Sequence, residues 1–305
     1  MIDDILTKAQ NDFDLEPDDV AELLATPLFS MDAARMQAAS RLKSRKASLN
    51  YAEVHAVLGR INTSDESPES YASMARQLEQ DGVNALIVGY EGSESSDDFL
   101  KRSSLIRNAL SPKTMIVAAV NAVEEKPLDA LKSTGYNGVH LTVHSGNYDD
   151  LIALADRCET IRAAGLLPGI CLVGLTADIT DEALVSALIA IRDAEPALSA
   201  VARHDPLGAG RYHEPGRLTT ARLTHIMTVM RLTMFGDVPA VGIHEPDVMG
   251  AVAGANILWA TAAGNQPGPT VITLREMFYD AQWRVLDGPS LCYGGTSPEQ
   301  LLKNK

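Results

Sequence analysis

Residues 138–173, GVHLTVHSGNYDDLIALADRCETIRAAGLLPGICLV, carry the pattern that decides the fold. Two short aliphatic runs, Gly138–Val143 and Leu167–Val173, flank an amphipathic stretch at Tyr148–Ala164, and Gly165 precedes the second run. Continuous apolar runs are typical of strands buried on both faces, and a glycine after a helix lets the chain turn through the left-handed region. The segment therefore predicts two parallel strands joined by a helix.

The same pattern recurs along the chain from residue 54 onward. Short apolar runs alternate with amphipathic segments of about 12–16 residues. The eight runs are Val54–Ile61, Ala85–Val88, Thr114–Val120, Gly138–Val143, Leu167–Val173, Ala197–Ala202, Pro239–Ile243 and Asn256–Ala260. Eight repeats within about 210 residues favour a closed (β/α)8 TIM-type barrel over an open doubly wound sheet, and no GxGxxG follows the first run.

The chain divides into three parts around this barrel. Residues 1–50 predict a helical extension, and residues 51–270 contain the barrel itself. Residues 271–305 predict a helix at Thr273–Val285 followed by a tail rich in Gly, Pro and Ser, which we expect to lie along the surface.

The composition restricts the class of protein. The chain has 305 residues, with 40 acidic and 26 basic side chains and a formal net charge of −14. Such a charge argues against nucleic-acid binding and against docking on an anionic membrane. No apolar run is long enough to cross a bilayer, no signal peptide is recognisable, and three cysteines are too few for a disulfide framework. We expect a soluble cytoplasmic protein with a small-molecule ligand.

Polar residues that follow the predicted strands define the candidate site, because parallel strands bring their carboxyl ends to one rim of a barrel. Four of the seven histidines fall at these strand ends or in the loops beyond them: His144, His204, His213 and His244. We predict catalytic roles for His204, His244 and Glu245, and substrate binding by Asn121, Arg211 and His213. Imidazole and carboxylate groups in this arrangement can act as acids, as bases or as metal ligands.

The remaining signals are weaker. The composition of residues 203–217, RHDPLGAGRYHEPGR, fits a flexible surface loop. Because the stretch follows a predicted strand, it also fits a lid or an anion clamp in which Arg203 or Arg211 holds a carboxylate. The chain has no HxH after the first strand and no HExxH, so we expect none of its residues to bind a metal. Cys171 lies inside a predicted strand and is interpreted as a buried apolar residue.

Several segments together resemble the radical S-adenosylmethionine barrels, most of all the biotin synthase and methylornithine synthase branch. They are residues 18–46 (DDVAELLATPLFSMDAARMQAASRLKSRK), 54–63 (VHAVLGRINT), 89–92 (GYEG), 205–215 (DPLGAGRYHEP), 237–246 (DVPAVGIHEP) and 250–264 (GAVAGANILWATAAG). The resemblance implies S-adenosylmethionine or an amino-acid-like substrate as the ligand. It assigns cofactor binding to Glu91, Thr142, His144 and Arg203.

One motif of that family is missing from this sequence. Its members carry CxxxCxxC directly after the first strand, whereas the matching stretch here, Asn62–Pro68, has no cysteine. Cys158, Cys171 and Cys292 are separated by 13 and 121 residues, far from the spacing of a cluster motif. We therefore expect no [4Fe–4S] cluster and no radical chemistry.

Three hypotheses for function follow. The leading one is a cluster-less barrel that binds a small polar ligand, either as a non-radical transferase or lyase or as an accessory binding protein. The second is a metal-dependent hydrolase or lyase that uses the His and Glu residues of the rim. The third is a non-catalytic subunit. A homo-oligomer or a partner enzyme is compatible with each of them.

Overall fold

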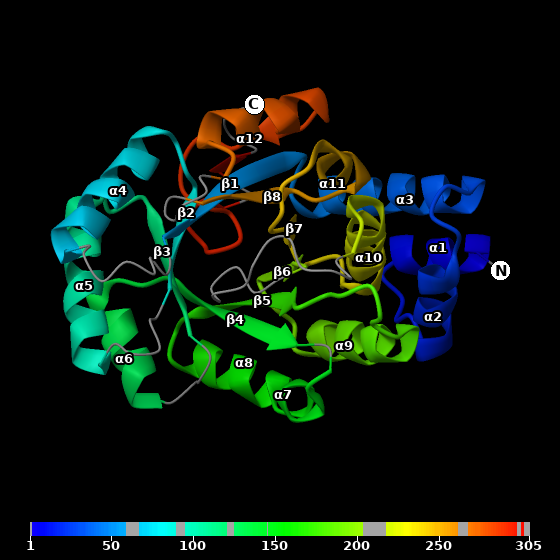
Figure 1. Ribbon diagram of the computed structural model, residues 1–305, viewed down its shortest axis with the longest axis horizontal. Coiled ribbons are helices and arrows are strands. Elements are labelled where there is room, and N and C mark those ends of the chain that lie inside the picture. Colours follow the sequence, from blue (N-terminus) through cyan, green and yellow to red (C-terminus); the bar gives the residue numbers. More distant parts are fainter. Residues whose placement is uncertain are drawn as a thin grey trace.

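Eight parallel strands close into a barrel in the computed structural model, which describes residues 2–58, 67–89, 95–120, 125–144, 146–203, 218–261, 268–297 and 300–301 (Figure 1). The strands are β1 (Tyr51–Leu58), β2 (Ala85–Gly89), β3 (Met115–Ala119), β4 (Gly138–His144), β5 (Leu167–Val173), β6 (Leu198–Val201), β7 (Ala240–Ile243) and β8 (Ile257–Thr261). Each strand pairs with the next, and β1 pairs with both β2 and β8, which closes the ring. The predicted TIM-type barrel is therefore confirmed.

Helices surround the barrel and connect its strands (Figure 1). They are α4 (Pro68–Gln80), α5 (Ser96–Ala109), α6 (Glu125–Thr134), α7 (Tyr148–Ile152), α8 (Leu154–Ala163), α9 (Asp181–Asp193), α10 (Thr220–Thr233), α11 (Val248–Ala253) and α12 (Val271–Asp280). All helices of the described residues are too short or too polar to cross a bilayer.

Two of the predicted helices have different bounds in the structure. The stretch 148–164 is divided at Ala153 into α7 and α8. The helix predicted to reach Val285 ends at Asp280, because Gln282 adopts a left-handed φ of 60° that a helix cannot contain. The chain then forms the short strand β9 (Arg284–Val285), which pairs with the start of β1.

Residues alternate between the two faces of the barrel wall. One set of strand side chains packs against the helices, for example Val139, Leu141 and Val143 of β4. The other set, which includes Cys171 and Trp259, faces inward and forms a separate cluster. Because a strand has a side-chain period of two, His140 lies on the inward face with Thr142.

The segment that follows β9 fills the amino end of the barrel, so the prediction of a surface tail is wrong for this part of the chain. The ring of Tyr293 is 2% exposed and lies against Gly138 and Gly169, where an added Cβ would come within 2.7 Å of it. The Leu291 amide donates to the Glu53 carboxylate over 2.9 Å. The composition indicated a solvated tail, but glycines in two strands leave room for a buried ring.

The N-terminal extension consists of three helices, α1 (Ile2–Gln10), α2 (Pro17–Ala25) and α3 (Met31–Ala47), which pack against α10 at one side of the barrel (Figure 1). Lys43 connects these elements from a buried position. Its Nζ donates to the carbonyl oxygens of Ala9, over 2.7 Å, and Leu232, over 3.3 Å, and lies 3.3 Å from the Asp12 carboxylate. Burial, followed by repulsion from Arg231, lowers the pKa of Lys43 to about 8.

This pKa predicts a pH dependence of stability. Between pH 8 and 10.5 the unfolded chain binds more protons at Lys43 than the folded chain, so the stability contributed by this residue rises with pH. Between pH 7 and 10, we expect the free energy of unfolding of the wild type to rise by about 2 kcal/mol relative to that of Lys43→Met. Urea unfolding of both proteins at a series of pH values measures this, and a constant difference would contradict it.

Candidate functional site

Three of the predicted site residues meet where β6 and β7 end. The Arg203 amide donates to both oxygens of the Glu245 carboxylate, each over 3.0 Å, and the Arg203 guanidinium donates to the Leu218 carbonyl over 3.0 Å. His244 and Glu245 are each 8% exposed. The Glu245 carboxylate therefore holds the chain after β6 next to the chain after β7, and the position of Arg203 depends on it.

The end of β4 supplies two further predicted residues. Thr142 is buried and lies opposite Cys171 of β5 in the register of the barrel. His144 is exposed, and its Nδ1 lies 2.8 Å from the place that a Cβ on Gly174 would take. Gly174 has a φ of 70°, so both its conformation and its lack of a side chain leave room for the imidazole.

Five of the predicted residues lie outside the described part of the chain: Glu91, Asn121, His204, Arg211 and His213. They belong to segments that follow β2, β3 and β6. Their roles stay predictions.

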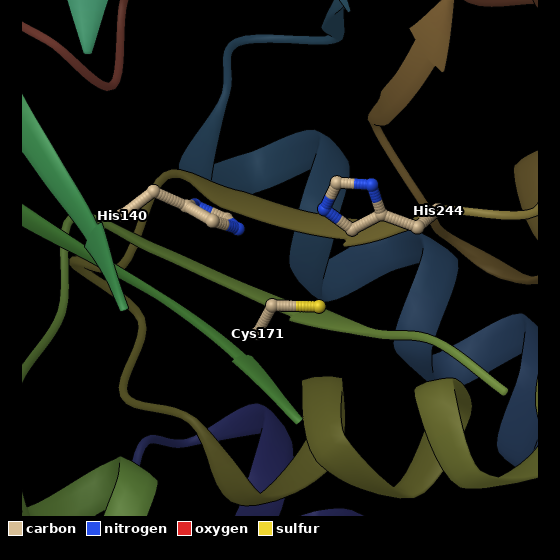
Figure 2. A group of neighbouring side chains, drawn as sticks. All are labelled: His140, Cys171 and His244. Carbon is tan, nitrogen blue, oxygen red and sulfur yellow. The ribbon is translucent and has the colours of Figure 1, made fainter. Parts of the chain in front are cut away.

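Inside the barrel, His244 forms a cluster with two residues that were not predicted as site residues from the sequence, His140 and Cys171. His140 of β4, Cys171 of β5 and His244 each offer one ligand atom, and these atoms lie within 4.8 Å of one another. Figure 2 shows the thiol and one imidazole ring on strands and the second imidazole ring, that of His244, on the chain that follows β7. The alternation His140-Leu141-Thr142-Val143-His144 was the available signal, because it places polar side chains on the inward face of a strand that is buried on both sides.

The environment of this cluster keeps its imidazoles in place. The His244 ring stacks on Trp259, with centroids 3.9 Å apart and an interplanar angle of 16°. The rings of His140 and His244 have centroids 5.5 Å apart. Burial, followed by repulsion from His55, lowers the pKa of His140 to about 3, so its imidazole is neutral at neutral pH. A neutral imidazole can bind a metal ion.

Fold and site together define the chain as a (β/α)8 barrel with polar side chains at the carboxyl end of its strands. In such barrels the loops at this end carry the active site. No model of a protein family matches the sequence, and no curated protein matches it.

Solved structures are similar to this chain over nearly its whole length. Methylornithine synthase matches with a TM-score of 0.70 and 13% identity, over 94% of this chain and 98% of that one. HydG, a maturase of the [FeFe]-hydrogenase, matches with a TM-score of 0.73 and 16% identity, over 99% and 80%. The HMG-CoA lyase of Brucella melitensis matches with a TM-score of 0.56 and 12% identity, over 84% and 99%. At these identities the similarity shows a common fold, and methylornithine synthase belongs to the branch that the sequence resembles.

Proposed function

We propose that the protein binds a small polar ligand, S-adenosylmethionine or an amino-acid-like molecule, at the carboxyl end of the barrel. The observation that carries the proposal is the placement of Thr142, His144, Arg203, His244 and Glu245 at this end. The opposite end is filled by Tyr293 and its neighbours, which leaves the carboxyl end as the entrance for a ligand.

The chemistry of these groups suits a ligand that carries one negatively charged and one positively charged group. A carboxylate on the ligand can accept hydrogen bonds from an imidazole or a hydroxyl, and an ammonium or sulfonium group is attracted to acidic side chains. His144 is exposed and therefore accessible to a ligand. The similarity to methylornithine synthase over 94% of this chain supports the same choice of ligand class.

The proposal includes no iron–sulfur cluster. In support of this, the three cysteines lie on separate elements: Cys158 in α8 outside the barrel wall, Cys171 in β5, and Cys292 in the segment at the amino end. A cluster needs three or four thiolates around one centre, and these positions do not suit it. The protein then acts as a non-radical transferase or lyase, or as a binding partner of another enzyme.

Titration calorimetry with S-adenosylmethionine and with S-adenosylhomocysteine tests the proposal. We expect the wild type to bind at least one of the two, and His144→Ala to weaken binding about tenfold through loss of a hydrogen bond to a charged group. Asn11→Ala, an exposed position in the helical extension, is the matched control and should bind as the wild type does. Absence of heat from both ligands at millimolar concentration would contradict this choice of ligand.

A further inference from the structure

The cluster of His140, Cys171 and His244 has the composition of a metal site. Its ligand atoms come from β4, from β5 and from the residue that follows β7, and lie within 4.8 Å of one another. The side chains converge inside the barrel (Figure 2). Two imidazoles and one thiol are a donor set that suits zinc, a borderline-soft ion.

The ring nitrogens of His140 are free to bind a further group. Its side chain is fully buried, and neither ring nitrogen has a hydrogen-bond partner among the described residues. A neutral imidazole carries one N–H donor and one acceptor, and an unsatisfied buried polar group is strongly unfavourable. An ion at the centre of the cluster would bind one of the two nitrogens.

The Nδ1 atom of His140 and the hydroxyl of Tyr293 lie near the same glycine, and neither has a hydrogen-bond partner among the described residues. His140 Nδ1 and the Tyr293 hydroxyl both lie beside Gly169, 3.2 Å and 2.5 Å from where its Cβ would be. Histidines that bind metals usually donate their second ring N–H to an oxygen, which fixes the tautomer. The stack of His244 on Trp259 restricts the second imidazole in a similar way.

A second group of potential ligands serves as a comparison. Glu53, His55 and Cys292 also bring their ligand atoms within 4.8 Å of one another. There each residue has a side-chain contact within the protein: Glu53 bonds with His55 Nε2 over 2.9 Å and accepts from the Leu291 amide, and Cys292 Sγ lies 3.2 Å from Ser290 Oγ. Only His55 Nδ1 of this group lacks a partner among the described residues, whereas both ring nitrogens of His140 lack one. The second group joins the C-terminal segment to β1, so we propose the ion at the first group.

We propose that His140, Cys171 and His244 bind one zinc ion inside the barrel. Three protein ligands leave a fourth tetrahedral position for water or for an oxygen or nitrogen atom of a substrate, which is the arrangement of catalytic zinc sites. His244 directly precedes Glu245, whose carboxylate accepts from the Arg203 amide, so the open position would adjoin the proposed ligand site. The inference does not depend on the identity of that ligand.

Metal analysis of the protein, purified without chelators and supplied with Zn²⁺, tests the proposal. We expect about one zinc ion per chain by mass spectrometry, and at least about tenfold weaker binding in His140→Ala and in Cys171→Ala. Zinc should raise the midpoint of thermal unfolding of the wild type and leave that of Cys171→Ala unchanged, since only the folded site binds the ion. A wild type that binds no zinc would overturn the proposal.

Cobalt substitution identifies the thiolate without removing it. In the double variant Cys158→Ala/Cys292→Ala the only remaining cysteine is Cys171. We expect this variant to bind Co²⁺ and to show the absorption of a cobalt–thiolate bond in the near ultraviolet, as the wild type does. If the wild type shows that absorption and the double variant does not, the thiolate is another cysteine and the assignment is wrong.

Discussion

Replacement of Tyr293 by alanine is expected to lower the free energy of unfolding by about 3–5 kcal/mol, the range measured for removal of large buried rings. The ring is 2% exposed and fills the amino end of the barrel between Gly138 and Gly169. Those glycines have no side chains that could close the cavity. Guanidinium unfolding followed by circular dichroism measures the loss.

Tyr148→Ala is the control for this variant, because Tyr148 in α7 is 65% exposed. The same chemical change at an exposed position should alter stability by no more than about 0.5 kcal/mol. Equal effects of the two substitutions would show that Tyr293 does not fill the barrel as described.

Gly242→Ala is expected to destabilise the protein by about 3 kcal/mol, at the upper end of the range for overpacked cores. An added Cβ at Gly242 would lie 2.2 Å from two atoms of the Trp259 ring and 3.1 Å from Ile257. The ring cannot yield easily, because its other neighbours include His244, on which it stacks at 3.9 Å. Urea unfolding, monitored by circular dichroism, provides the measurement.

Gly146→Ala provides the matched control, because a Cβ there would meet no atom within 4 Å. We expect its stability to stay within about 0.5 kcal/mol of the wild type. A smaller ring at position 259 should relieve the overlap, so Gly242→Ala combined with Trp259→Phe should be less destabilised than the sum of the two single changes. Strict additivity would show that the two positions are not in contact.

The barrel could be predicted because each strand is buried on both faces and is therefore visible as an apolar run. The course of the chain after β9 was harder to predict. Residues 286–297 have the composition of a solvated tail, and only the glycines of β4 and β5 indicate that something large approaches those strands. A single glycine in a strand also fits a bulge or a bend, so Gly138 and Gly169 did not by themselves identify Tyr293.

The sequence indicated some of the residues that the structure brings together at the candidate site, and the reason lies in their position along the strands. His244, Glu245 and Arg203 stand at strand ends, where polar residues signal a rim. His140 and Cys171 stand within strands, where the sequence alone cannot distinguish a core residue from a ligand. Only the barrel closure brings β4, β5 and β7 near enough for their side chains to meet.

The C-terminal segment that follows β9 and fills the amino end of the barrel has a consequence for the order of folding. Its hydrogen bonds join residues very far apart in the chain: Leu291 to Glu53, 238 positions earlier, and Asn84 to Leu286, 202 positions later. Contacts between residues so far apart in the chain form slowly, because closing the long loop between them costs conformational entropy before the contacts can stabilise the structure. Closure of the ring pairs Glu53 of β1 with Ile257 of β8, residues of similar separation, so ring closure and docking of this segment should both be late steps of refolding. Docking of this segment should then exclude water from the end of the barrel that it covers.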